Sequence, residues 1–272
     1  GHDRSGLLAV AYNRKAQEEM AARTEGLGAR IQTLNALGYE IVGRHAGRRP
    51  QLIDEREVRR RLEPHLPKLQ HRLNTDPMAP YLEGLSVVRL GLRDPDEVEL
   101  EADAPGLAGA VEPYREGLRR DGVLDFDEQI VHAVELLLAD GEFRRAEQAR
   151  HRHLLVDEFQ DLTPAHVLLI RILAAPTFDV FGVGDDDQVV YGHGGATPRF
   201  LIHFAELFPG AHEHALQVNY RCPPQVVDAA RHLLAYNEQR VAKQIDAARP
   251  ASRDDALVVR KHGPDAGATA LV

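Results

Sequence analysis

The sequence predicts an α/β fold in which a mostly parallel sheet is interrupted by a mainly helical insertion. Short runs of apolar and β-branched residues are typical of buried parallel strands. Helical patterns lie between these runs, and such alternation indicates a mostly parallel sheet. In addition, the stretch from Ala46 to Asp121 lacks a convincing strand and is rich in charge and proline. We therefore predict a sheet domain formed by residues 1–45 and 122–272, with a helical subdomain at 46–121.

The predicted strands are short and break into polar residues. They are expected at Leu7–Tyr12, Leu154–Val156, Val180–Val183 and Ala256–Val259. The predicted helices carry apolar residues three and four positions apart. They are expected at Arg14–Arg23, Phe126–Ala139 and Pro164–Leu173, with a further helix from Pro224. In the second of these helices one face carries Phe126, Ile130, Val134, Leu137 and Leu138.

Within the insertion, Arg56–Leu62 is the clearest predicted helix. The acidic stretch Asp94–Asp103 is expected to be a solvated loop.

Composition excludes several classes of protein. The net charge is −9, which argues against a surface that coats duplex DNA by bulk counterion release but leaves room for a local single-strand groove. A single cysteine, Cys222, cannot form an intramolecular disulfide or a multi-cysteine metal site. No apolar run approaches the roughly 20 residues of a membrane span, so we expect a cytoplasmic protein with no membrane partner.

The strongest chemical signal is the segment His153–Asp161, where an apolar run ends in Asp157 and Glu158. Parallel strands deliver such carboxylates to the carboxyl edge of the sheet, where ligands of open α/β folds bind. In phosphate-loop NTPases an aspartate at this place holds Mg²⁺ and a neighbouring residue orients the attacking water. The alternative is that the carboxylates only cap the helix that begins near Pro164.

Two further segments follow in order. Residues 181–196 form a strand that breaks into a polar, glycine-rich loop containing Gln188, Tyr191 and His193. Asn219-Tyr220-Arg221 then presents an arginine that is free to meet negative charge. Each segment alone is a weak signal, because glycine-rich turns and isolated arginines are common.

Together the three segments resemble motifs II, III and IV of the UvrD/Rep/PcrA-type superfamily 1 DNA helicases. The resemblance extends upstream to Ala9–Ala16, Thr33–Gly38 and Asp125–Asp127, so it covers roughly residues 7–45 and 122–260. It implies a RecA-like phosphate-loop NTPase core that uses ATP and Mg²⁺.

The resemblance also implies a role for each matching residue. Asp157 would hold Mg²⁺, Glu158 would activate water, and Gln188 and Arg221 would contact the γ-phosphate of ATP. Gln160 and Asp161 would link the metal site to the neighbouring motifs. The nucleic-acid face would contain Tyr12, Asn13, Lys15, Thr33, Asn35, Tyr191 and His193.

The function that the resemblance implies is ATP-dependent translocation on single-stranded DNA in the 3′ to 5′ direction, in DNA repair or recombination. Single-strand to double-strand junctions and repair or nuclease proteins would be its partners. The alternative is a non-catalytic nucleic-acid-binding or scaffold protein that keeps the helicase fold.

Two departures from the family pattern matter. No Gly-x-x-x-x-Gly-Lys-Thr/Ser segment occurs in the printed sequence, so we expect the chain to begin downstream of that loop and to be inactive as an ATPase by itself. The chain also has His193 and Gly194 where relatives commonly carry an aromatic residue followed by arginine. An imidazole stacks more weakly than a larger ring, which predicts a weaker grip on DNA at this point.

Overall fold

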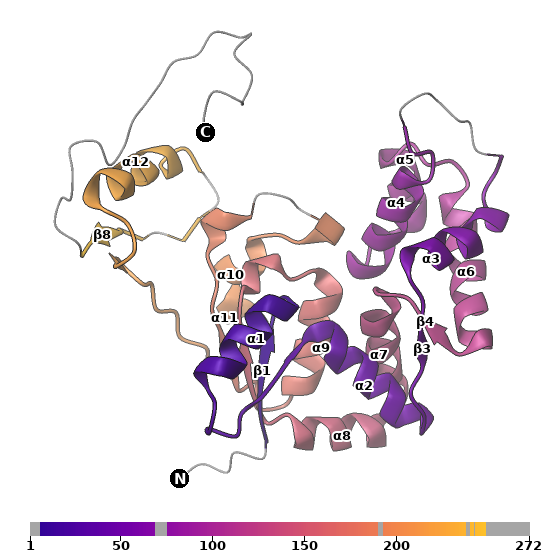
Figure 1. Cartoon of the computed structure of the whole chain (residues 1–272), viewed down its shortest axis with the longest axis horizontal. Coiled ribbons are helices and arrows are strands. Elements are labelled where there is room, and N and C mark those ends of the chain that lie inside the picture. The colour runs from indigo at the N-terminus through magenta and orange to yellow at the C-terminus, as the bar shows by residue number, and fades with distance from the viewer. Residues whose placement is uncertain (1–5, 69–74, 190–192, 238–239, 242, 249–272) are drawn as a thin grey trace, which may run out of the picture. The chain divides into compact units, whose positions relative to one another are not determined.

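A four-stranded parallel sheet organises the larger part of the molecule, as a computed structural model shows (Figure 1). The structure describes residues 6–68, 75–189, 193–237, 240–241 and 243–248. They fall into two compact units, Gly1–Ala211 and His212–Val272, which are described separately. The sheet belongs to the first unit.

The strand order is β2-β1-β5-β6, and all neighbouring strands run parallel. The bounds are β1 Leu7–Ala11, β2 Arg30–Thr33, β5 His153–Val156 and β6 Val180–Gly182. Val10 of central β1 pairs with Gln32 on one side and Val156 on the other. The predicted strands β1, β5 and β6 are confirmed, whereas β2 was not predicted.

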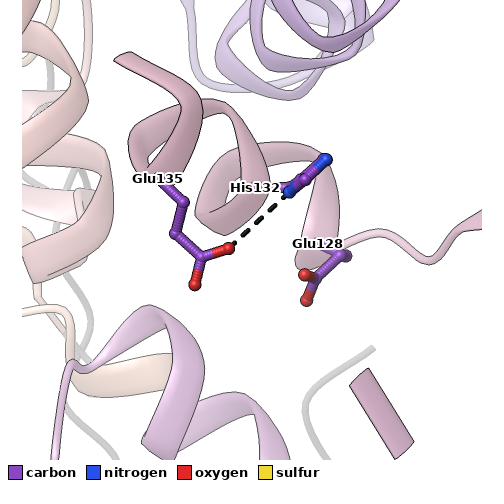
Figure 2. A group of neighbouring side chains, drawn as sticks. All are labelled: Glu128, His132 and Glu135. Atoms are coloured by element: carbon purple, nitrogen blue, oxygen red, sulfur yellow. Dashed lines mark ion pairs between the residues drawn. The ribbon is translucent and has the colours of Figure 1, made fainter. Parts of the chain in front are cut away.

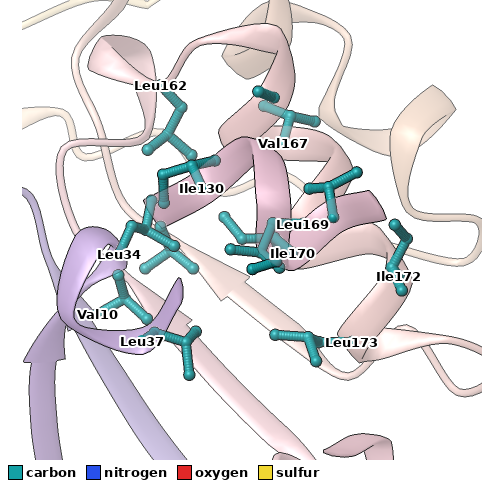
Figure 3. Packing of buried hydrophobic residues seen from close by; sticks show 14 of the residues in the cluster. Val10, Leu34, Leu37, Ile130, Leu162, Val167, Leu169, Ile170, Ile172 and Leu173 are labelled. Carbon is teal, nitrogen blue, oxygen red and sulfur yellow. The ribbon is translucent and has the colours of Figure 1, made fainter. Parts of the chain in front are cut away.

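Five helices pack around the sheet, and most of them begin at a side-chain cap. The bounds are α1 Arg14–Arg23, α2 Leu34–Ala46, α7 Glu128–Ala139, α8 Gly141–Arg150 and α9 Pro164–Ala174. Asn13, Thr33 and Thr163 cap α1, α2 and α9 by accepting from backbone N–H groups, which satisfies donors that a helix start leaves open. Figure 3 shows α2, α7 and α9 contributing apolar side chains beside Val10 of β1.

One helix differs from its prediction. Helix α7 begins at Glu128, not at Phe126, and both Phe126 and Leu138 are exposed. Ile130, Val134 and Leu137 are buried as predicted. The predicted apolar face was too wide, because Phe126 lies in the turn before the helix, where the 3.6-residue period does not apply.

The stretch predicted as an insertion is mainly helical in the structure (purple in Figure 1). Its bounds are α3 Glu55–Leu62, a 3₁₀ turn η2 at Glu63–His65, α4 Ala79–Leu90, α5 Pro95–Glu101 and α6 Leu107–Asp121. A second hydrophobic cluster, from Leu62 to Val123, holds these helices together. The boundaries at 45/46 and 121/122 stay a prediction.

The acidic stretch is a helix and not the predicted loop. Asp94 accepts hydrogen bonds from Asp96 N and Glu97 N, and Pro95 occupies the first turn of α5. Aspartate followed by proline is a strong start for a helix, and this local signal outweighs the high charge density. Within its described residues this stretch also contains β3 Gln51–Leu52, which pairs parallel with β4 Val123–Leu124.

The remaining elements are short, with the exception of α12. After β5 come 3₁₀ turns η3 Phe159–Asp161, η4 Asp186–Gln188 and η5 His193–Gly195, with α10 Arg199–Ile202 and α11 Phe204–Leu207. The second unit contains β7 Val218–Asn219, α12 Pro224–Leu234 and β8 Asp246–Ala247. The predicted strand Ala256–Val259 lies outside the described residues. Within the described ranges, none of the helices has the length and apolar character that crossing a membrane requires.

Candidate active site

The carboxyl ends of the four parallel strands gather most of the predicted site residues along one edge of the sheet. Tyr12 follows β1, Thr33 ends β2, Asp157 and Glu158 follow β5, and Gln188 lies in the loop after β6. Parallel strands end at the same edge, so residues far apart in sequence share it. This edge is the candidate site.

The backbone around Glu158 is fixed by hydrogen bonds to β1 and to the residue that follows β6. Asp157 N donates to Val10 O at 3.0 Å, and Phe159 N donates to Val183 O at 2.8 Å. Between these two anchors Glu158 has a φ of 49°, in the left-handed region that a residue with a Cβ rarely adopts. The chain turns sharply at Glu158 and enters η3.

Gln160 connects Glu158 to the loop after β6. Its side chain is 1% exposed, its Nε2 donates to Glu158 Oε2 at 2.8 Å, and its Oε1 accepts from Asp185 N at 2.9 Å. The bridge needs a glycine at position 184, since a Cβ built there would lie 2.5 Å from Gln160 Oε1. Gln160 therefore holds one oxygen of the Glu158 carboxylate.

The loop after β6 continues this chain of contacts. Asp185 accepts from Asp187 N at 3.2 Å to start η4, and its Oδ2 accepts from Gln188 Nε2 at 2.8 Å. Gln188 is exposed. A continuous hydrogen-bonded path thus runs from Glu158 through Gln160 and Asp185 to Gln188.

The carboxylates of Asp157 and Glu158 suit a bound cation. Both are partly exposed, and within the part of the chain that the structure describes neither forms an ion pair with an arginine or lysine. Oxygen ligands of this kind are those that Mg²⁺ prefers in proteins. The residues present therefore fit the predicted metal.

Asp161 lies close enough to influence its neighbours electrostatically. Burial, followed by the charge of Glu158, raises the pKa of Asp161. Burial, followed by the charge of Asp161, raises the pKa of the Tyr12 hydroxyl. Tyr12 therefore stays protonated, and its electrostatic environment includes the segment that follows β5.

Tyr12 is 49% exposed at the end of β1. Beside it, Asn13 Oδ1 accepts from Ala16 N at 2.9 Å, and Lys15 is exposed on α1. The side chain of Asn13 is thus committed to capping α1, while the Tyr12 ring and the Lys15 ammonium face solvent. Exposure is what a stacking role for Tyr12 requires, and the role itself stays a prediction.

Phe126 was predicted on the apolar face of a helix and not among the candidate site residues, yet the structure leaves it exposed. Phe126 is 65% exposed, and its carbonyl accepts from Asn35 Nδ2 at 2.7 Å. Thr33, a predicted nucleic-acid contact on the neighbouring strand, has a different task. Its Oγ1 accepts from Ala36 N at 3.2 Å and so caps α2. The resemblance already included Asp125–Asp127, but no role was assigned to the aromatic residue between the two aspartates.

The remaining predicted residues are placed only in part. Tyr191 lies outside the described residues, and His193 is described through its backbone in η5. Asn219 belongs to the second unit, where its Oδ1 accepts from Arg221 N at 2.9 Å and from Cys222 N at 2.8 Å. This turn leaves Arg221 exposed.

Another cluster with metal-binding residue types is an ion-pair network. Figure 2 shows Glu128, His132 and Glu135 along α7, with His132 Nδ1 3.6 Å from Glu135 Oε2. Arg115 of α6 donates to Glu128 at 2.9 Å and to Glu135 at 2.8 Å. Burial would raise the pKa of Glu135, but the nearby His132 ring and the hydrogen bond from Arg115 outweigh it and lower the pKa to about 2. Arginine already neutralises these carboxylates, so they fasten α6 to α7.

Comparison with known proteins places these observations in a family. The UvrD/REP helicase N-terminal domain family matches residues 1–209. The ATP-dependent DNA helicase PcrA of Staphylococcus epidermidis is 27% identical over 253 residues, which cover 87% of this chain and 34% of PcrA.

Two other relatives match shorter segments at higher identity. The ATP-dependent DNA helicase UvrD2 of Mycobacterium tuberculosis is 36% identical over 59% of this chain and 23% of that protein. DNA helicase II of Escherichia coli is 38% identical over 48% of this chain and 18% of that protein. The chain thus spans about a third or less of the length of these relatives.

Proposed function

The chain belongs to the UvrD/REP helicase family by its N-terminal domain, and from this premise we propose that it forms part of an ATP-dependent motor that acts on single-stranded DNA. The observation that carries the proposal is the path Glu158–Gln160–Asp185–Gln188 at the carboxyl edge of a parallel sheet that also presents Tyr12. Such a path joins a group that could activate water to a loop that could contact phosphate.

Each residue of the edge has a distinct part in this proposal. Asp157 would hold Mg²⁺, which supplies charge neutralisation on the phosphates when bound. Glu158 orients the attacking water with its free oxygen, since Gln160 occupies the other one. Gln188 contacts the γ-phosphate and reports its presence to Glu158 through Asp185. For Arg221 the proposal keeps only the role that the resemblance implies, a contact of its positive charge with the γ-phosphate of ATP.

The nucleic-acid face uses the neighbouring residues. The exposed rings of Tyr12 and Phe126 stack on bases, which is sequence-tolerant because every base has a π face. Lys15 meets the backbone phosphates. Asn35 supports Phe126 by donating a hydrogen bond to the Phe126 carbonyl. Asn13 and Thr33 contribute by capping α1 and α2. Tyr191 and His193 complete the face in this proposal.

Finer features of the proposal concern the complete protein. Movement from 3′ to 5′, action at single-strand to double-strand junctions, and a role in repair or recombination with partner proteins are proposed from family membership. Mg²⁺ as the metal is proposed from the donor set of Asp157 and Glu158.

The test is the single-strand-stimulated ATPase of the complete gene product. Glu158→Gln keeps the shape of the side chain but removes the group that orients water, so turnover should fall by roughly 10²- to 10⁴-fold while Mg·ATP still binds. Glu25→Gln, an exposed glutamate after α1, is the matched control and should keep the rate. Near-normal ATPase in the Glu158→Gln protein would favour the non-catalytic scaffold instead.

A further inference from the structure

One buried arginine of the helical insertion holds the acidic residues on both sides of Phe126. Arg89, in the last turn of α4, is 5% exposed. Its Nη1 donates to both carboxylate oxygens of Asp125, at 3.0 and 2.8 Å, and its Nη2 donates to Asp127 Oδ2 at 3.0 Å. Charge-assisted bonds from a planar guanidinium fix direction as well as distance. Arg89 therefore restrains the backbone before and after Phe126.

Other elements secure the same short segment. The Tyr114 hydroxyl of α6 donates to Asp125 Oδ2 at 2.6 Å, and Glu128 N donates to Asp125 Oδ1 at 2.7 Å as α7 begins. From α2, Asn35 Nδ2 donates to the Phe126 carbonyl. The backbone of this segment is thus anchored from four helices, whereas the Phe126 ring remains in solvent. An aromatic residue that served the hydrophobic core would instead have a buried ring.

The same turn of α4 also contacts the glycine-rich loop. Gly194 and Gly195 of η5 have φ values of 61° and 86°, and a Cβ built on Gly195 would lie 3.1 Å from the Cα of Gly91. Leu90 packs beside Gly194. The backbone of η5 therefore contacts the backbone at the end of α4, directly after the loop that carries Gln188. A shift of η5 has to move the end of α4 with it.

We infer that Arg89 is a positioning residue for nucleic-acid binding: through it the last turn of α4 presents the Phe126 ring to a base and links that ring to η5. The inference rests on the proposed single-strand face and assigns a part in it to the helical insertion. Restraining the backbone that carries the ring lowers the ordering cost that a mobile segment has on binding. The ligand is single-stranded nucleic acid, read by stacking.

A fluorescence experiment tests the positioning without DNA. The chain has no tryptophan, so Phe126→Trp creates a single indole probe at an exposed position. Arg89→Lys keeps the charge but loses the two-pronged donor. In the Arg89→Lys background, the nanosecond anisotropy decay of Trp at this position should gain a larger fast component. Arg93→Lys, a partly exposed arginine paired with Glu97 and Glu101, is the control and should leave the decay unchanged.

Single-strand affinity then tests the function of that positioning. Loss of one stacked base weakens binding by roughly 5- to 150-fold, and we expect Phe126→Ala and Arg89→Lys each to fall in this range on a labelled oligothymidine. The double variant should bind no more weakly than Phe126→Ala alone, because both remove the same contact. Combining Arg89→Lys with Tyr12→Ala should instead multiply the two losses.

Several outcomes would overturn the inference. An unchanged anisotropy decay in Arg89→Lys, or losses that multiply with Phe126→Ala, would show that Arg89 does not act through the ring. Absence of binding by the unsubstituted chain would refute the proposed single-strand face itself, whereas binding that survives Arg89→Lys would refute the inference alone. Thermal melts check folding, and if Arg89→Lys unfolds the chain, the isosteric Asp127→Asn takes its place with the same expected pattern.

Discussion

Replacing Gln160 by methionine tests the bridge that holds Glu158. Methionine keeps a similar length but removes the donor to Glu158 Oε2 and the acceptor for Asp185 N. A hydrogen bond to a charged group contributes roughly 1.5 to 3 kcal/mol and one between neutral groups about 1 kcal/mol. Because Gln160 is buried, solvent cannot replace either bond. We therefore expect the free energy of unfolding to fall by about 2 to 4 kcal/mol.

Urea unfolding of the chain, followed by circular dichroism, measures this loss. The control is Gln51→Met, an exposed glutamine in β3, which should change stability by less than about 0.5 kcal/mol. In the complete gene product, Gln160→Met should also lower the maximal ATPase rate more than it changes the KM for ATP, because it moves the water-orienting group and not the nucleotide. A stability loss no larger than that of the control would refute the bridge.

Three further predictions follow from contacts in the first unit. Tyr12→Ala should weaken single-strand affinity by about 5- to 150-fold on thymine- and adenine-rich strands alike, with little change in salt dependence. A lower melting temperature with unchanged affinity would contradict the stacking role of Tyr12. Glu147→Gln should destabilise the chain at neutral pH. Burial would raise the pKa of Glu147, but the nearby His151 ring and the hydrogen bonds from Arg44 lower it from 4.5 to about 2. About 3 kcal/mol of stability is therefore present above pH 4.5 and is lost as the pH falls toward 2. Acid unfolding curves of the two proteins should converge at low pH, and parallel curves would contradict the assignment. Gly184→Ala should displace the Gln160 side chain and cost stability comparable to Gln160→Met, and a melting temperature equal to that of the unsubstituted chain would show that the loop yields easily.

Local chemistry made much of the fold predictable. The helix at Arg14–Arg23 has the predicted bounds because Asn13 caps its start, and the helix from Pro164 begins where a threonine and a proline meet. Strand β2 escaped prediction because three of its four residues, Arg30, Gln32 and Thr33, are polar, although Gln32 is buried beside β1. Its pairing partner, and not its own composition, makes it a strand.

The site was predictable at the level of residue types and order, but not at the level of contacts. Apolar runs that end abruptly in polar residues predicted Asp157, Glu158 and the loop of Gln188 as site residues. Their positions at one sheet edge follow from the parallel pairing of the strands. No local pattern indicated that Gln160 would join these segments, or that Arg89 would meet Asp125 from 36 residues away. Such contacts depend on how helices pack over long sequence separations.

The left-handed backbone at Glu158 bears on how this chain evolves. A residue with a Cβ held at a φ of 49° costs of order 1 kcal/mol, a cost that glycine avoids and asparagine reduces. Selection for folding alone would therefore favour glycine or asparagine at this position. A lineage that had become a scaffold would gain stability by that replacement, whereas one under selection for turnover must accept the strain. Glutamate at position 158 thus marks a place where stability and chemistry oppose each other, and Glu158→Gly is the variant in which their balance can be measured.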